Sequence, residues 1–350
     1  MNAPERAAPE SPGRPAQREG PLRFSVRWGS GVGAENFRRA AVLAEELGFD
    51  QIWTGNDLFR RSGIIPITLA LDATRRIHVG SSVLNPVTLH PAELAGIAAA
   101  LQDFSGGRFL LGLGAGSEVF LPWAGIRPDR PLERTRRGIR AVRALLEGRS
   151  PVDVPGAGEG WHPAARLKDG PCAPTPIYVG AMGPKLLQLA GREADGVMAL
   201  CLPPSRFHWV QEQVDKGSAG ERTIDLACGL WVAIDEDRDV ARNLLAGRIA
   251  AYGGALSKDA LAAAGYDVER FDRIQELVTA GDLATATAMV DDRMLELGIA
   301  GDVAEVTERC LDLIRQGTRH ISFGSALGVA PLEAIRLIGE QVLPTLRGTP

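Results

Sequence analysis

Charged side chains interrupt or follow three apolar runs in the first third of the sequence. Arg27 lies inside the run FSVRWG, Asp57 follows QIWTGN, and Glu118 comes shortly after FLLGLGAG. An arginine can hold an acidic or carbonyl oxygen by paired hydrogen bonds, and a carboxylic acid can deliver a proton if burial raises its pKa. These residue types favour substrate positioning and proton transfer. An ion pair for Arg27 and solvated loop carboxylates for the other two explain the same pattern without chemistry.

Small residues gather where four predicted strands end. They are Gly80-Ser81-Ser82, Gly112 to Ser117, Gly180-Ala181-Met182-Gly183, and Gly324-Ser325-Ala326. Small side chains in such places cost backbone entropy and add little packing, so a large group should lie against that backbone. The run from Gly180 also opens into a helix, whose free N–H groups and positive dipole end suit a phosphate. These runs make room for a flat ligand or a phosphate, and tight turns are the alternative.

The rest of the chain supplies the elements that would position these residues. Short apolar runs predict eight strands, at 24–29, 51–56, 77–83, 109–116, 176–182, 194–200, 224–234 and 320–326. Helical spacing between them predicts helices at 34–47, 91–104, 132–148, 184–193, 203–216 and 331–343. Buried strands that alternate with helices indicate parallel pairing with crossover connections.

Eight such units predict an α/β fold, a closed (β/α)8 TIM barrel, with an open doubly wound sheet as the alternative. Two stretches depart from the repeat, and we interpret them as insertions at about 149–175 and 235–319. In a barrel the carboxyl ends of the strands converge on one mouth, where active sites form. The small runs and the charged residues should therefore meet there.

Composition narrows the class of protein. A formal net charge of −4 gives no basic excess for nucleic acid or a membrane surface. The four cysteines are scattered, and no spacing of His, Cys or Asp predicts a metal site. Residues 1–20, rich in Pro, Ala and charge, predict a disordered tail before a single domain at 21–347. We expect a cytoplasmic enzyme that acts on a small molecule and forms a homodimer.

Two histidines bear on the architecture. His90 precedes Pro91 at a predicted helix start, where it could cap the helix or contact a cofactor. His320 opens the last predicted strand, on the face of a barrel that does not carry chemistry.

The sequence also resembles the luciferase-like monooxygenase superfamily, and within it the enzymes that use the deazaflavin coenzyme F420, such as methylenetetrahydromethanopterin reductases. The resemblance covers about residues 22–346. Its most specific pieces are GFDQIW (48–53), RIHVGSSVLNPVTLHPAELAGIAAALQDFSGGRFLLGLGAG (76–116) and PIYVGAMGPKLLQLAGREADGV (176–197).

The resemblance implies a cofactor site. In F420 enzymes the third strand ends in a bulge with a non-prolyl cis peptide pressed against the deazaflavin ring, and the matching bond here is Ser82–Val83. The glycine-rich runs that follow would line the ribityl chain and phosphate. The implied cofactor contacts are Asn56, Ser81, Ser82, Val83, Asn85, Gly114, Ala115, Gly116, Ser117, Gly180, Ala181, Met182, Gly183, Pro184 and Lys185.

This chain departs from the family where relatives do their chemistry. Asn56-Asp57 stands in place of an Asp-His pair, so the histidine that removes a proton in the sugar-phosphate dehydrogenases is absent. Arg27 stands where methylenetetrahydromethanopterin reductases carry a glutamate, and Ser117 where relatives are often acidic. The substrate should therefore differ from those of both groups. Arg27, Asp57 and Glu118 stay as the candidate catalytic residues.

Three functions remain open on the sequence alone. We favour an F420-dependent oxidoreductase that transfers hydride from reduced F420 to a C=C or C=N bond of a small organic substrate. The first alternative is an FMN-dependent luciferase-like monooxygenase that uses O2. The second alternative is a protein that binds a flavin or deazaflavin without catalysis.

Overall fold

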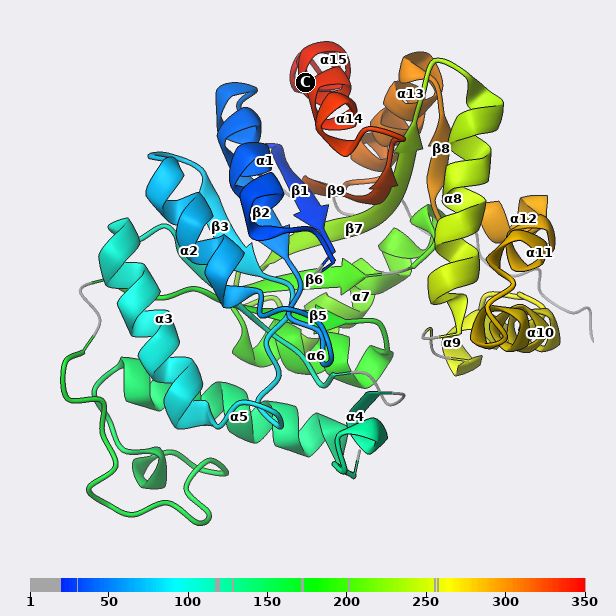
Figure 1. The fold of residues 1–350 in the computed structure, drawn as a ribbon. Coiled ribbons are helices and arrows are strands. Elements are labelled where there is room, and N and C mark those ends of the chain that lie inside the picture. The colour runs from blue at the N-terminus through cyan, green and yellow to red at the C-terminus, as the bar shows by residue number, and fades with distance from the viewer. Residues whose placement is uncertain are drawn as a thin grey trace, which may run out of the picture.

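A closed barrel of parallel strands forms the centre of the molecule (Figure 1). The computed structural model describes residues 20–349 except 30, 117–119, 128, 171–172, 201, 255 and 257, and only the backbone of 260 and 263. The predicted tail, apart from Gly20, lies outside the described residues.

Eight strands close the barrel, in the order β1-β2-β3-β4-β5-β6-β7-β9 and back to β1. Their bounds are β1 Arg23–Trp28, β2 Gln51–Thr54, β3 His78–Ser81, β4 Phe109–Leu113, β5 Ile177–Ala181, β6 Gly196–Leu200, β7 Asp225–Ile234 and β9 His320–Leu327. The predicted barrel is confirmed, and the open sheet is wrong because β6 also pairs with β7. All eight predicted strands are present.

A ninth strand, β8 Ile299–Gly301, was not predicted. It pairs with the last residues of β7 and lies outside the closed barrel. A strand of three residues is too short to show a periodic pattern, so it could not be predicted from the sequence.

Helices surround the strands. They are α1 Ala34–Glu46, α2 Ile64–Ala73, α3 Pro91–Ser105, α4 Phe120–Trp123, α5 Pro131–Leu146, α6 Pro184–Glu193, α7 Phe207–Ser218, α8 Arg238–Gly253, α9 Lys258–Ala263, α10 Val268–Thr279, α11 Leu283–Ala288, α12 Asp292–Leu295, α13 Val303–Arg315, α14 Pro331–Leu337 and α15 Leu343–Arg347. Each helix predicted from spacing is found within a few residues, although 331–343 divides into α14, a π turn and α15. Helix α2 was missed because its sequence, IIPITLALDA, is apolar on almost every side and shows no helical period.

The side chains of each strand alternate between two cores. Outward residues, such as Val26, Ile52 and Val79, pack against the surrounding helices. Inward residues fill the barrel with a smaller cluster of Trp53, Leu110, Tyr178, Met198 and Ala227. The barrel is therefore a packed core, and a ligand has room only at its ends.

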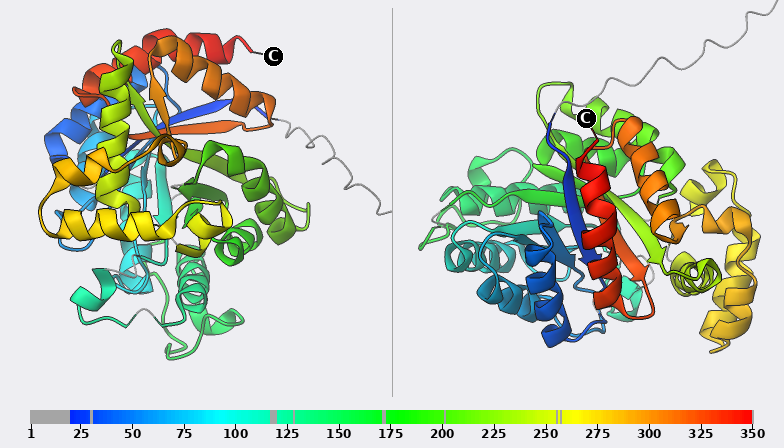
Figure 2. Two further views of the ribbon diagram at one scale, coloured as in Figure 1. Left: turned by 90° about the vertical axis from the view of Figure 1, so that its right-hand side faces the viewer. Right: turned by 90° about the horizontal axis from the view of Figure 1, so that it is seen from above.

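The insertion at 235–319 is mostly helical, as expected. Its helices α8 to α12 build a second layer beside the barrel, whereas α13 packs into the core around the barrel strands. Helices α10 and α11 pack on α8, and the whole group stands to one side of the strands (Figures 1 and 2). Its apolar cluster also includes Met182 and Ala326, which follow or end barrel strands. The insertion therefore reaches the carboxyl ends of β5 and β9. None of the helices in the described part of the chain has the length and apolar character needed to cross a membrane.

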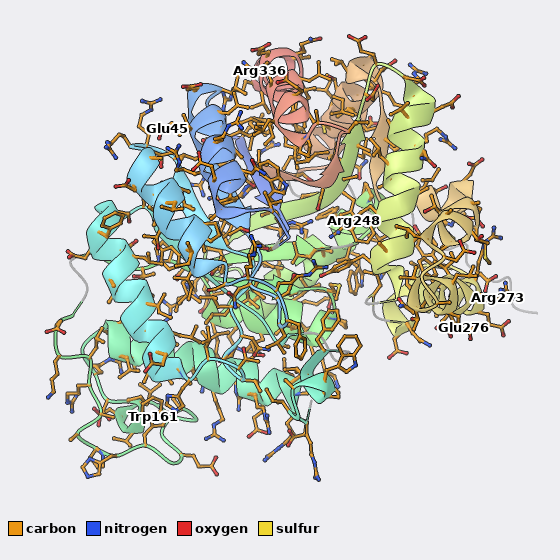
Figure 3. The ribbon with its side chains drawn as sticks, viewed as in Figure 1. Glu45, Trp161, Arg248, Arg273, Glu276 and Arg336 are labelled. Carbon is orange, nitrogen blue, oxygen red and sulfur yellow. The ribbon has the colours of Figure 1, made fainter. Side chains whose placement is uncertain are left out.

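The insertion at 149–175 lies along helices instead. The Trp161 ring is 5.0 Å from that of His90 at the start of α3, and Figure 3 shows Trp161 far from the insertion helices. The His90 Nδ1 accepts a hydrogen bond of 3.2 Å from the Ala92 N–H. The helix-cap interpretation of His90 is thus confirmed.

Candidate active site

One row of residues crosses five neighbouring strands near the mouth. Strand register sets Gly80, Trp53, Arg27, Gly324 and Trp231 side by side. A Cβ added at Gly80 would lie 2.1 Å from the Trp53 ring, and one at Gly324 would lie 2.5 Å from Nη2 of Arg27. The two glycines therefore make room for the two large side chains beside them. This places the Arg27 guanidinium inside the barrel, with 8% of the residue exposed.

A bulge after β3 forms the opposite part of the rim. The Ser82–Val83 peptide bond is cis, as the resemblance implied. The Ser82 N–H donates to the Thr54 carbonyl at 2.7 Å, and the Leu84 N–H donates to the Gly112 carbonyl at 2.8 Å. The bulge is thus fastened to both neighbouring strands.

The small residues of β4 and β5 accommodate this bulge. A Cβ at Gly114 would lie 2.6 Å from Cγ2 of Val83, and one at Gly180 would lie 2.8 Å from Cγ1 of the same residue. The large group that lies against these two glycines is therefore the Val83 side chain. Val83 is half-buried and packs on the cluster inside the barrel, so part of its side chain is open to a ligand at the mouth.

Two of the predicted cofactor contacts have structural partners. The buried Ser81 hydroxyl donates to the Gly112 carbonyl and accepts from the Gly112 N–H. The Asn85 Nδ2 donates to the Ala115 carbonyl at 3.2 Å, and its Oδ1 accepts from the Val87 N–H at 2.8 Å. Both side chains hold the bulge in place.

The predicted phosphate site has the space that it requires. No atom lies within 4 Å of a Cβ added at Gly183, which precedes α6 in an extended conformation. No side chain caps α6, whereas His90 caps α3. Pro184 and Lys185 are exposed at the same helix start. The first-turn N–H groups of α6 therefore face open space.

The remaining predicted site residues lie in the loops after β2 and β4. The Asn56 Oδ1 accepts from the Gly63 N–H at 2.8 Å, which closes the loop on itself. Asp57 is exposed, so the burial on which its role as an acid depended is not present here. Ser117 and Glu118 lie outside the described residues. The roles of these four residues stay predictions.

Several buried polar atoms at the mouth have no hydrogen-bond partner within the described residues. They are Ser82 Oγ, Ser325 Oγ, Trp231 Nε1 and Arg248 Nε. Buried donors and acceptors are nearly always paired, so a polar ligand belongs among them. A deazaflavin with its polar edge and phosphate fits Ser82 Oγ and the open α6 start.

Trp231 and Arg248 were not predicted. Trp231 lies in a run that reads as an ordinary buried strand, and Arg248 lies on a helix of the insertion. Only the register and the packing of α8 on β7 bring the two together.

A rival cavity opens at the other end of the barrel. It has a volume of about 560 Å3 and is lined by Arg23, Glu45, His78 and Tyr178, among others. The Glu45 carboxylate there accepts from the backbone N–H groups of residues 75–77. Because its polar groups serve the fold and it lies at the amino ends of the strands, we place the chemistry at the mouth.

Beside this cavity, a buried network ties four strands together. The His320 Nδ1–H donates to Asp225 Oδ1 at 3.0 Å, since a carboxylate can only accept, and the Ser25 hydroxyl lies 2.9 Å from Nε2. The Tyr178 hydroxyl donates to Asp225 Oδ2 at 2.7 Å. Burial alone raises the pKa of Asp225, but His320, Tyr178 and Arg23 outweigh it and hold the pKa well below its usual range. His320 is structural, as its position at a strand start indicated.

We expect Asp225→Asn to lower the free energy of unfolding at pH 7 by about 3 kcal/mol, the scale for breaking a buried charged pair. A carboxyl group whose pKa is lower in the folded protein than in the unfolded chain stabilises the folded protein at any pH above its unfolded pKa of about 4. This stabilisation is lost as the pH falls from there toward the pKa of the folded state. The difference in free energy of unfolding between the wild type and the variant should therefore decrease below about pH 4. Urea unfolding from pH 7 to pH 3 measures it.

The control is Asp292→Asn, because the Asp292 side chain is 92% exposed and pairs with Arg242 at the surface. It should change stability by less than about 1 kcal/mol at any pH. An equal effect of the two substitutions would contradict a special role for the Asp225 network.

The sequence and the fold were compared with those of known proteins. The luciferase-like monooxygenase family matches residues 21–320. The chain belongs to that family. A 5,10-methylenetetrahydromethanopterin reductase of Archaeoglobus fulgidus is 31% identical over 320 residues, which cover 87% of this chain and 94% of the relative. An F420-dependent glucose-6-phosphate dehydrogenase of Nakamurella multipartita is 29% identical, with 92% and 97% covered.

A solved structure agrees with this. The coenzyme F420-dependent tetrahydromethanopterin reductase of Methanopyrus kandleri superposes with a TM-score of 0.83 at 27% identity and covers 93% of this chain and 99% of its own. The recognised likeness to the F420-dependent branch of the luciferase-like family is thus confirmed. By their names, two of these three proteins are F420-dependent, and two are reductases of tetrahydromethanopterin or its methylene form.

Proposed function

We propose that this member of the luciferase-like family is an F420-dependent oxidoreductase that reduces a C=C or C=N bond of a small organic substrate. The observation that carries the proposal is the bulge after β3, which is hydrogen-bonded to both neighbouring strands and sets the half-buried Val83 at the mouth. The F420-dependent relatives and the matching fold support the choice of cofactor.

When bound, F420 supplies the hydride. The residues that would hold it are Val83 against the ring and Gly180 to Lys185 at the phosphate, with the α6 N–H groups as donors. Ser82 Oγ, which is buried and has no partner within the described residues, would be a further donor to the bound cofactor. This part of the chain binds and orients the cofactor, which is most of what a hydride transfer requires.

The substrate side of the mouth differs from the cofactor side. Arg27 would position an acidic or carbonyl oxygen, and Asp57 or Glu118 would supply the proton that follows hydride. Exposed Asp57 could serve only after the loop or the substrate covers it, so a change on substrate binding is part of the proposal.

The test is a titration of the purified protein with F420 and, in parallel, with FMN, in which binding is measured by fluorescence. We expect F420 to bind in the micromolar range or tighter and FMN to bind at least tenfold more weakly. A substrate screen coupled to F420 oxidation then separates an enzyme from a protein that only binds the cofactor. Preference for FMN with O2 consumption would favour the monooxygenase alternative.

A cytoplasmic location and a homodimer also belong to this proposal. Size-exclusion chromatography with light scattering tests the dimer, and fractionation of cells tests the location. Neither result bears on the choice of cofactor.

A further inference from the structure

An arginine from the insertion lies at the barrel mouth among aromatic rings. Arg248 and Tyr252 stand one turn apart on the same face of α8. The Arg248 guanidinium carbon is 4.4 Å from the Tyr252 ring centroid and 5.6 Å from that of Trp231 on β7. Figure 3 shows Arg248 between α8 and the strands. The two rings therefore fix the cation in one place.

This arginine has unused hydrogen-bonding capacity. Its Nε is buried and has no partner within the described residues, and the same holds for the indole Nε1 of Trp231. Trp231 itself is 1% exposed. An unpaired buried donor is costly, and an anion at the edge of the Trp231 ring would suit both donors, since the Arg248 guanidinium carbon lies 5.6 Å from the centroid of that ring.

A second cation lies in the same row of residues. Gly324 on β9 separates Trp231 from Arg27 in the strand register. Neighbouring strands are about 4.8 Å apart, so the backbones of Arg27 and Trp231 are roughly 10 Å apart. A small anion beside Trp231 is therefore within reach of both long arginine side chains.

The position also sets Trp231 across the mouth from Val83. Strands β3 and β7 are four strands apart in either direction around the barrel, so they face each other across the mouth. A ring held against Val83, just after β3, would turn its other face toward β7. The residues Trp231 and Arg248 would thus meet the second ligand.

We propose that Arg248 and Trp231 Nε1, with Arg27 beside them, hold the carboxylate of the substrate, so that the enzyme reduces a small α,β-unsaturated carboxylic acid. This deepens the proposed function and rests on it. In the reaction, reduced F420 gives a hydride to the β-carbon and an acid gives a proton to the α-carbon. The C=C π bond is lost, two C–H bonds form, and F420 is oxidised. The arginines offset the carboxylate charge that would otherwise repel hydride.

The test compares acids with their neutral amides. Cinnamate, cinnamamide, crotonate and crotonamide are titrated by calorimetry into the wild type, Arg248→Gln and Arg248→Lys, with and without F420. We expect Arg248→Gln to weaken the binding of the acids at least tenfold and to leave the amides and F420 within about twofold, given the strength of charge-assisted hydrogen bonds. Arg248→Lys should keep part of the preference for acids.

Arg242→Gln is the matched control, because it removes the same charge from the same helix at a surface ion pair with Asp292. It should change no affinity. Thermal unfolding of each variant verifies that it is folded.

The outcomes separate the two proposals. If the wild type binds F420 but prefers no acid over its amide, the carboxylate inference is wrong and the proposed function stands. If Arg248→Gln loses F420 affinity tenfold while acid binding is unchanged, Arg248 holds the anionic tail of the cofactor instead, which also overturns the inference. If the wild type does not bind F420, the proposed function fails, and the titrations without cofactor still decide whether the acid preference depends on Arg248.

Discussion

Replacing Arg27 with methionine should lower kcat by roughly 10²-fold or more and leave the Kd for F420 within about twofold, the usual scale for a lost positioning group. Methionine keeps most of the buried stem, so the variant removes the charge without opening a large cavity. The guanidinium lies over Gly324 of β9, whereas the α6 start follows β5. The measurements are steady-state kinetics with the best substrate of the F420-coupled screen, and F420 titration by fluorescence.

Arg23→Met is the control for this variant. It removes the same charge from the same strand, but at the other end of the barrel, where Arg23 pairs with Asp225. It should lower stability and leave kcat unchanged. Full activity of Arg27→Met would remove Arg27 from the site, and a loss of F420 affinity would reassign it to the cofactor.

The barrel could be predicted because its signals are local. Each outward face, such as that of Val26 or Ile52, packs on helices and so leaves an apolar run in the sequence. Glycine and proline then mark where the strands end and the helices begin. Helix α2 lacked such a pattern, since it is apolar on almost all sides.

The candidate site was predictable only in part, because its two halves depend on different information. The bulge at Ser82–Val83 lies in a contiguous motif, so a resemblance could place it. Trp231 and Arg248 come from two distant parts of the chain, and only strand register and helix packing unite them. The glycines also had a nearer cause than a ligand, since Gly114 and Gly180 make room for Val83. That contact joins residues far apart in the sequence.

A substitution at Gly183 tests F420 binding without disturbing the fold, which substitutions at the other small residues of the rim would not do. A side chain at Gly114 or Gly180 would collide with Val83, whereas Gly183 has no atom within 4 Å of an added Cβ. Its φ of −92° suits any residue. Gly183→Leu should therefore fold normally, but its side chain would fill the space before the α6 N–H groups. We expect F420 binding to weaken by about 100-fold, because two or more charge-assisted hydrogen bonds to the phosphate would be lost.

The matched control is Gly33→Leu. Gly33 also precedes a helix on the rim, has an extended conformation (φ −61°, ψ 148°), makes no side-chain cap and has no atom within 4 Å of an added Cβ. It follows β1, away from the predicted phosphate, so its substitution should leave F420 affinity within about twofold. F420 fluorescence titration and thermal unfolding of both variants distinguish the cases. If Gly183→Leu binds F420 as tightly as Gly33→Leu does, the phosphate site lies elsewhere on the rim, and the α6 start has no part in holding the cofactor.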